Sequence, residues 1–270
     1  MDDIKEMEFD TLEAIAVSVA AFEANDGYVK TGEYDYNTNQ PDPEIKKYPN
    51  KELIRAYFGV DHYSVDAPRP PLVKVTDEHR MLAEDIRNYS KKAVFKVLGK
   101  KPVEDIFAVS LGSAIKDYEE QLYQILNQDK VKIFNLGFVA SAPLYYDNGK
   151  KRDYAKNRLS DLDSKHVGTI GGKIVLNNFE VIRNTKSRNF EGHVIQGICD
   201  GNLFLYFSSR PADHIKVGDR INIVGKIKDH IMEKETIPMN KLNYVSERIN
   251  SNGDVAQTSF VRADDNSNLF

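Results

Sequence analysis

The stretch Val217-Gly218-Asp219-Arg220-Ile221-Asn222-Ile223-Val224-Gly225-Lys226-Ile227-Lys228-Asp229-His230-Ile231 predicts a long β-strand that begins after a Gly-Asp turn. One face of this strand is apolar, because it carries Ile221, Ile223, Ile227 and Ile231. The other face is polar and mostly basic, and it carries Arg220, Asn222, Lys226, Lys228 and His230. The strand therefore suits a hydrophobic core on one side and a polyanion on the other.

Charge is unevenly distributed along the chain. The 270 residues carry a net charge of −4, which alone argues against a general nucleic-acid-binding protein. Residues 150–248, however, hold 18 Lys/Arg against 12 Asp/Glu, a net of +6, whereas the rest holds 19 against 29, a net of −10. This asymmetry indicates a basic binding domain beside an acidic one, and it makes nucleic acid the leading hypothesis for the ligand.

Composition bounds the class of protein. A hydrophobic content of 41% is enough for a folded core. Cys199 is the only cysteine, which excludes an intramolecular disulfide and suits a reducing compartment. No apolar run approaches the roughly 20 residues that span a bilayer, and the acidic residues 1–6 do not suit a signal or transit peptide. We therefore expect a cytoplasmic protein with no membrane segment.

The N-terminal part, residues 1–145, is predicted to be mostly helical. Capping residues and apolar spacing favour helices at residues 10–24, 50–58, 76–98 and 102–126. The polar residues 25–49 are expected to form a long loop, and the Pro-rich residues 68–71 an extended connection. Residues 146–164 contain clusters of Lys and Arg, and we interpret them as a basic linker or as a basic arm of the second domain.

From residue 165 the pattern changes to short strands with glycine-containing turns. Strands are expected at residues 170–183, 192–199, 203–208, 220–231 and 236–244, with a hairpin turn at Asp200-Gly201. Five strands of this kind suit the closed oligonucleotide-binding (OB) barrel. The fold class is therefore α+β: a mostly helical N-terminal domain, an OB-like β-barrel at residues 165–248, and a flexible tail at residues 249–270.

The predicted barrel suggests where a ligand binds, since its second and third strands and two flanking loops form the binding face in this architecture. Cations neutralise phosphates, and aromatic rings stack on bases. Phe204 and Tyr206 form an exposed aromatic pair if the aliphatic side of their strand is core; otherwise another part of the chain covers them. The side chains expected to contact nucleic acid are Arg183, Lys186, Arg188, Phe190, His193, Phe204, Tyr206, Lys226, Lys228 and His230.

Four segments carry a family resemblance: Gly168-Thr169-Ile170-Gly171-Gly172-Lys173, Asp200-Gly201-Asn202-Leu203-Phe204-Leu205-Tyr206-Phe207-Ser208-Ser209, Val217-Gly218-Asp219 and Gly225-Lys226-Ile227-Lys228-Asp229-His230. Together they resemble the barrel domain of phage single-stranded-DNA-binding and replication-associated proteins. The resemblance covers residues 165–246, less than a third of the chain. It implies sequence-nonspecific binding of single-stranded DNA in replication, recombination or repair.

The end of the chain, Asp264-Asp265-Asn266-Ser267-Asn268-Leu269-Phe270, is similar to the acidic tails of single-stranded-DNA-binding proteins. The resemblance implies that Asp264, Asp265, Leu269 and Phe270 recruit replication proteins. Acidic groups beside an anchoring aromatic ring suit a basic pocket with an apolar floor. A frayed terminus without a function is the alternative.

Other function classes receive less support. The chain has no phosphate-binding loop, no dinucleotide fingerprint and no grouped zinc ligands, so we expect no cofactor, no metal and no enzymatic activity. One alternative is a protein-interaction module that recruits replication or host factors without binding nucleic acid. A second is a nuclease that uses N-terminal carboxylates with Mg²⁺. The sequence does not decide whether the ligand is DNA or RNA, or whether copies of the chain associate with each other.

Overall fold

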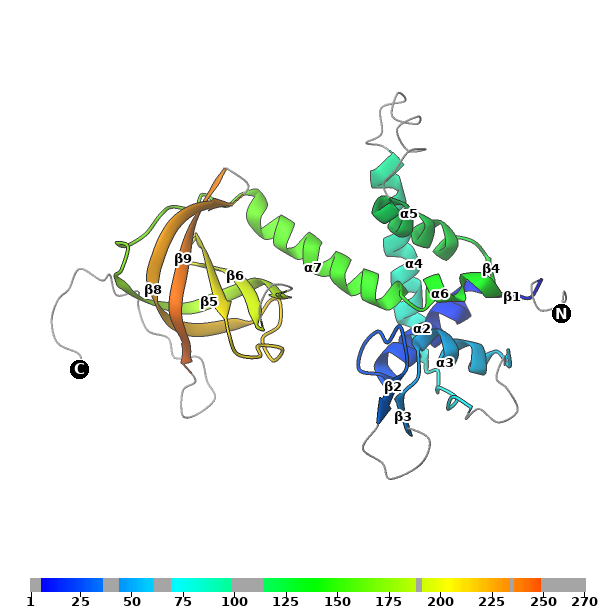
Figure 1. Cartoon of the computed structure of the whole chain (residues 1–270). Coiled ribbons are helices and arrows are strands. Elements are labelled where there is room, and N and C mark those ends of the chain that lie inside the picture. Colours follow the sequence, from blue (N-terminus) through cyan, green and yellow to red (C-terminus); the bar gives the residue numbers. More distant parts are fainter. Residues whose placement is uncertain are drawn as a thin grey trace. The chain divides into compact units, whose positions relative to one another are not determined.

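The computed structural model describes residues 6–35, 44–60, 69–98, 114–187, 191–233 and 236–248. The chain divides into two compact units, unit 1 (Met1–Gly149) and unit 2 (Lys150–Phe270). Helices dominate unit 1, and unit 2 contains a closed five-stranded barrel (Figure 1), which confirms the α+β class. Every helix in the described part of the chain is too short or too polar to cross a lipid bilayer.

Unit 1 is arranged around its first helix. Its elements are β1 (Glu8–Asp10), α2 (Thr11–Ala24), β2 (Glu33–Asp35), β3 (Glu44–Lys47), α3 (Asn50–Tyr57), α4 (Asp77–Leu98), α5 (Ala114–Leu126), β4 (Lys130–Lys132), the 3₁₀ helix η3 (Ile133–Asn135), α6 (Leu136–Val139) and the start of α7 (Ala142–Ser160). The Asp10 side chain caps α2 by accepting a hydrogen bond from the Glu13 amide at 2.9 Å. Helix α2 is apolar on nearly all sides because α3, α4, α5 and α6 all contact it.

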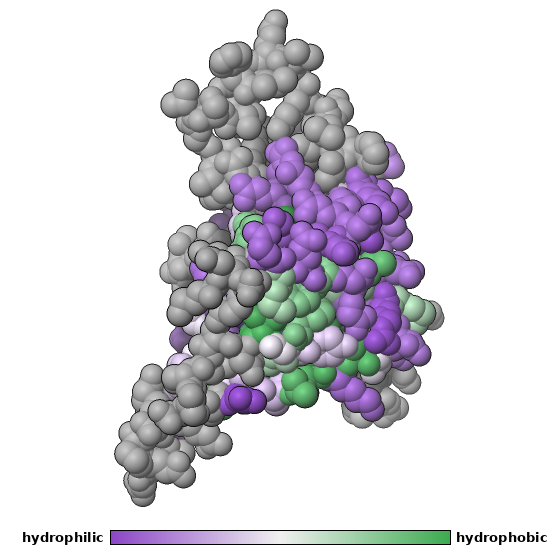
Figure 2. All heavy atoms as spheres, turned by 90° about the vertical axis from the view of Figure 1, so that its right-hand side faces the viewer, coloured by the Kyte–Doolittle hydropathy of each residue, from purple (hydrophilic) through white to green (hydrophobic). Residues whose placement is uncertain are grey.

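Apolar residues also reach the surface of unit 1. Figure 2 shows an apolar area bordered by hydrophilic residues, on the side of the molecule where Figure 1 places β1 and β4. Met7, which precedes β1, and Phe134, which follows β4, are 37% and 63% exposed. The two segments are neighbours, because the Ile133 amide donates a hydrogen bond to the Met7 carbonyl at 3.1 Å.

Unit 1 differs from the prediction at the expected loop of residues 25–49. The predicted loop at residues 25–49 contains β2 and β3, which pair antiparallel with each other. These strands are difficult to predict because they are polar. Their side chains are not part of the hydrophobic core, so no apolar alternation marks them in the sequence. The loop closes on the buried side chain of Asn50, whose amide oxygen accepts hydrogen bonds from the Val29 amide at 2.7 Å and from Asn25 at 2.9 Å. The helix predicted at 102–126 is described only from Ala114 onward.

Unit 2 contains all five predicted strands. They are β5 (Lys173–Lys186), β6 (His193–Cys199), β7 (Asn202–Ser208), β8 (Arg220–Glu233) and β9 (Ile237–Arg248). The barrel closes in the order β5-β6-β7-β9-β8, with β7 and β9 parallel and all other neighbours antiparallel. This five-stranded barrel is consistent with an OB-like fold.

Large side chains fill the barrel. Phe179 is fully buried, and its ring lies where a side chain at Gly197 would be, because a Cβ there would come within 2.4 Å of the ring. The connection between β7 and β8 adds Ala212 and Ile215 to the same core. Gly197 is therefore required by packing, since even a methyl group would displace the central aromatic ring.

The segment predicted as a basic linker, residues 146–164, is mostly helical, because α7 continues to Ser160. The later turns of α7 belong to unit 2 and pack against the outside of the barrel. Ala155 and Leu159 are buried there in an apolar cluster with Ile182, Ile198, Leu203, Leu205 and Met239. The apolar positions of this stretch are too few to predict the packing beside its many charges.

Candidate nucleic-acid interface

The outer face of β6 and β7 corresponds to the predicted binding face, and much of it is apolar and covered by the chain itself. Ile198, Leu203 and Leu205 point outward and are at most 9% exposed. Leu159 of α7 packs in the same cluster and is 7% exposed. A polyanion cannot reach this part of the barrel while α7 holds its place.

A buried carboxylate fixes α7 on the barrel. Glu180 accepts hydrogen bonds from Arg158 Nε at 2.6 Å, from Arg158 Nη2 at 2.7 Å and from the Tyr154 hydroxyl at 2.7 Å. Burial alone would raise the pKa of Glu180, but these hydrogen bonds and the charges of Arg158 and Arg220 outweigh it, so the pKa is lowered. The charged form of Glu180 therefore stabilises the contact between α7 and β5.

The predicted exposed pair Phe204 and Tyr206 is wrong. Both rings lie inside the barrel, 1% and 3% exposed, and the Tyr206 ring centroid is 6.0 Å from that of Phe179. Both faces of β7 are apolar, so alternation alone could not decide which face is inside. The rings fill the barrel, while the aliphatic face of β7 lies under α7, and neither ring is available for stacking on a base.

Two other predicted contact residues have partners within the barrel. Arg183 Nη1 lies 3.0 Å from Gln196 Oε1 and 3.2 Å from Glu233 Oε1. His193 is 5% exposed, and its Nδ1 lies 2.8 Å from Asn184 Oδ1. These contacts connect strands and loops of the barrel, and they leave the His193 side chain buried, whereas the Arg183 side chain stays 38% exposed.

Of the other predicted contacts, apart from His230, three are exposed and six lie outside the described residues. Lys186 is exposed at the end of β5, and Lys226 and Lys228 are exposed on β8. The other six predicted contacts, which comprise two in the β5–β6 loop and four in the tail, lie outside the described residues: Arg188, Phe190, Asp264, Asp265, Leu269 and Phe270.

Two exposed lysines oppose each other across the barrel surface. Lys173 of β5 is the direct cross-strand partner of Lys226 in β8, and both are exposed. Like charges at directly opposed positions of an antiparallel pair are destabilising. Among the described residues, no carboxylate forms an ion pair with Lys173, Lys226 or Lys228. A bound polyanion would remove this repulsion.

Tyr244 lies beside these lysines in a strained conformation. Its side chain is 83% exposed, and Lys226 Nζ lies 6.0 Å from its ring centroid. Its backbone φ is +50°, where the strand pairing between β8 and β9 is irregular. The other described non-glycine residues with positive φ are all Asp or Asn, which tolerate that region, whereas a bulky residue there is an outlier. Such strain is characteristic of functional positions.

A second cation–ring pair lies on the other side of β9. Phe207, at the end of β7, is 45% exposed, and Lys241 Nζ lies 5.2 Å from its ring centroid. Strand β9 thus carries Lys241 beside β7 and Tyr244 beside β8. We call this surface the basic–aromatic band, and it consists of Lys173, Phe207, Lys226, Lys228, Lys241 and Tyr244.

Sequence reasoning identified only two members of this band, Lys226 and Lys228. Lys173 and Lys241 lie in predicted strands, but their neighbours depend on strand register, which the sequence leaves undetermined. Tyr244 points outward because of a local irregularity in β9, and no periodic pattern encodes such an irregularity. The one available signal was a tyrosine close to lysines in a basic region.

His230, also a predicted contact, is half-buried in a stacked pair. Its ring is nearly parallel to that of His166, with centroids 4.7 Å apart. His166 Nε2 lies 3.0 Å from the Ile231 carbonyl oxygen, and His230 Nε2 lies 3.4 Å from that of Val167. Because a carbonyl oxygen only accepts, both rings carry a hydrogen on Nε2. Through these hydrogen bonds, the two histidines connect the segment before β5 to strand β8.

The described residues offer little support for metal binding or for thiol chemistry. They contain no group of three or more His, Cys, Asp and Glu placed to hold a metal ion. Burial, followed by the nearby Asp200, raises the pKa of the Cys199 thiol to about 12. A thiol of that pKa is protonated at neutral pH and is a poor nucleophile.

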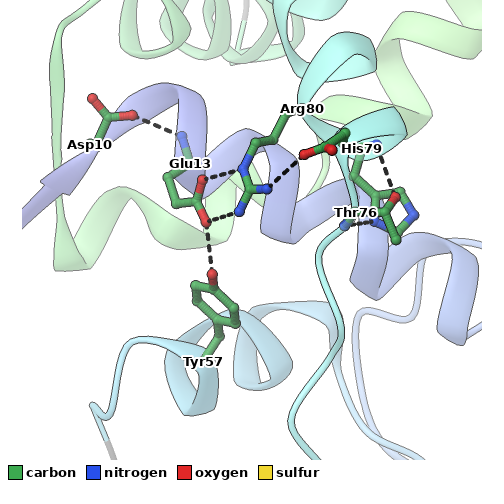
Figure 3. A network of polar contacts seen from close by, with 7 residues as sticks. Asp10, Glu13, Tyr57, Thr76, His79 and Arg80 are labelled. Atoms are coloured by element: carbon green, nitrogen blue, oxygen red, sulfur yellow. Dashed lines mark hydrogen bonds and ion pairs between the residues drawn. The ribbon is translucent and has the colours of Figure 1, made fainter.

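Unit 1 holds a polar network of its own (Figure 3) that connects α2, α3 and α4. The Tyr57 hydroxyl donates to Glu13 Oε1 at 2.7 Å, and Arg80 donates to both Glu13 oxygens at 3.2 and 3.3 Å. The hydrogen bonds from Arg80 outweigh the effect of burial and lower the pKa of Glu13, with Tyr57 contributing. Glu13 is paired with Arg80, which also contacts Asp77 at 3.3 Å, so we interpret the network as a structural contact between helices.

Two surfaces of the barrel therefore differ in kind. The face under α7 is apolar and buried, whereas the basic–aromatic band is cationic, exposed except at the half-buried Lys241, and strained at Tyr244. The function of the chain is inferred from its own residues. Comparison of the chain with protein-family models, with curated proteins and with solved structures finds no match.

Proposed function

We propose that unit 2 binds single-stranded nucleic acid, DNA in the first instance, without base specificity and through the basic–aromatic band. The observation that carries the proposal is Tyr244, an exposed aromatic ring held at positive φ beside the opposed lysines Lys173 and Lys226. The five-stranded barrel, consistent with an OB-like fold, supports it, because that architecture commonly binds oligonucleotides.

The physical basis is electrostatic attraction combined with stacking. Lysines that neutralise phosphates release condensed counterions, which gives affinity that falls with salt. Tyr244 and Phe207 offer ring faces to bases, and stacking contributes roughly 1–3 kcal/mol per base for any base. Neighbouring strands lie about 4.8 Å apart, so the band from β7 over β9 and β8 to β5 is wide enough for a few nucleotides. Duplex DNA offers no accessible base faces to these rings.

The band favours nucleic acid over the alternative of a barrel that only docks proteins. A protein-docking surface is expected to be a flat apolar patch. The exposed rings here, Tyr244 and Phe207, each have a lysine above them, as in a groove that combines cations and stacking. Replication, recombination and repair are the processes that expose single-stranded DNA, and we place the activity among them.

The test is fluorescence anisotropy of a labelled oligo-dT across a salt series, with a duplex of equal length beside it. We expect tight, salt-dependent binding of the single strand only. Lys173→Glu should weaken binding and lower the salt slope by about one unit for the lost phosphate contact. Lys165→Glu is the matched control, since Lys165 is also an exposed lysine of unit 2 and lies outside the band. Absence of binding to either oligonucleotide at low salt would refute the proposal.

A further inference from the structure

Unit 1 contains a cleft of about 590 Å³ that the barrel does not involve. The end of α2 and Leu53 of α3 line it, β3 and the residue after it border it, and an extended segment before α4 completes it. Ala20, Ala24, Leu53 and residues 71–73 form the apolar part of the lining, and its other residues are polar.

The segment at residues 71–75 resembles a strand without a partner. Val73 and Val75 are half-buried against the core of unit 1, whereas Leu72 and Lys74 are exposed. This alternation is that of an extended chain. Among the described residues, none forms a hydrogen bond with the backbone of residues 71–75. The segment therefore presents unused backbone N–H and C=O groups at strand spacing beside a cleft.

The lining of the cleft is cationic. Among the described residues, it contains Lys46, Lys47 and Lys74 but a single carboxylate, that of Glu23, which lies 2.6 Å from His79 Nε2. The Thr76 amide donates a hydrogen bond to His79 Nδ1 at 3.1 Å, and His79 Nε2 faces the Glu23 carboxylate, so the single carboxylate of the lining already has a partner.

Of the three lysines, two have partners in unit 1. Lys46 is paired with Asp35 at 2.8 Å, and Lys47 donates to the Asn25 carbonyl at 2.6 Å. Lys74 has no ion-pair partner among the described residues. An anionic ligand in the cleft would therefore meet at least one cation whose charge nothing else in the described structure balances.

We propose that this cleft binds an extended acidic peptide segment of a partner protein. The peptide adds as a strand along residues 71–75, which span about 17 Å when extended. Its carboxylates face Lys74 and the lysines of β3, and its apolar side chains meet Ala24 and Leu72, which line the cleft and are exposed. Free backbone groups favour a peptide over a nucleic-acid strand, because a strand edge is completed by amide hydrogen bonds rather than by phosphates.

The experiment measures anisotropy of a fluorescein-labelled peptide of alternating Glu and Val residues, titrated with the full chain. The unmodified peptide should bind, and the same peptide N-methylated on alternate amides should not, since methylation removes the donors that pair with the 71–75 backbone. Lys74→Glu should weaken binding about fivefold or more. Lys91→Glu, the same charge change at an exposed lysine of α4 outside the cleft, should leave it within about twofold.

Three results would overturn the proposal. The first is equal binding of the methylated and unmodified peptides, and the second is equal weakening by Lys74→Glu and Lys91→Glu, which would indicate attraction to overall charge. The third is displacement of the peptide by oligo-dT in the Lys226→Glu variant, which would assign the cleft to nucleic acid instead. Because Lys74 is exposed, the melting temperature should be unchanged and loss of folding is separable from loss of binding.

Discussion

Replacing Tyr244 by glycine separates its role in binding from its effect on folding. A non-glycine residue in the left-handed region costs about 1–2 kcal/mol, and φ of Tyr244 is +50°. Glycine removes that cost but loses about 0.5–1 kcal/mol of chain entropy in a strand. Because the ring is 83% exposed, little packing is lost with it. We therefore expect Tyr244→Gly to leave the free energy of unfolding unchanged or to raise it by about 1 kcal/mol.

Binding of oligo-dT should change in the opposite direction. Loss of one stacked base costs roughly 1–3 kcal/mol, which corresponds to about 5- to 150-fold in the dissociation constant. Anisotropy with labelled oligo-dT and urea denaturation of the same preparation measure the two effects. Tyr244→Phe is the control, since it keeps the ring and should bind as the unmodified chain does. A glycine variant that binds oligo-dT with unchanged affinity would show that the strained ring does not contact the ligand.

The remaining predictions concern stability. Leu159→Ala should lower the free energy of unfolding of unit 2 by about 2–5 kcal/mol, measured by denaturant unfolding, because Leu159 is 7% exposed in the cluster under α7; a change below about 0.5 kcal/mol would mean that α7 does not pack there. Glu13→Gln should make the stability of the protein less dependent on pH in the acid range. The folded pKa of Glu13 is below its ordinary value of 4.5, so its stabilisation is present above that pH and is lost as pH falls through the lowered pKa. Thermal melts at descending pH should therefore converge for the two proteins, and parallel curves would contradict the assignment.

Period-two patterning and turn chemistry predicted the five barrel strands, and the reason is physical. Strands such as β8 have one apolar and one polar face, so alternation identifies them, and Asp200-Gly201 supplies the positive φ that a tight hairpin needs. Alternation fails for β7, where both faces are apolar. The aliphatic face of β7 points outward because α7 covers it. That packing depends on Ala155 and Leu159, which stand among many charged residues in the sequence.

The candidate site was less predictable than the fold. Lys226 and Lys228 follow from the polar face of one strand, but the feature that distinguishes them is the position of Lys173 across the ladder. Cross-strand register and the irregularity at Tyr244 arise from the closed barrel as a whole. Local sequence therefore identified cations in the right region, whereas only the assembled barrel brings them beside an exposed ring.

Two independent sources of instability, a strained backbone and a pair of opposed lysines, lie close together on β5, β8 and β9. Their coincidence favours a binding site over chance. The left-handed backbone of Tyr244 costs about 1–2 kcal/mol, and the opposed Lys173 and Lys226 cost up to about 1 kcal/mol. Against a typical stability of 5–15 kcal/mol, a domain tolerates both. A polyanion offsets the repulsion of the lysines and occupies the ring face at once. Saturating oligo-dT should therefore stabilise the barrel by mass action, and part of that gain should disappear in Lys173→Glu, where the repulsion it relieves is already absent.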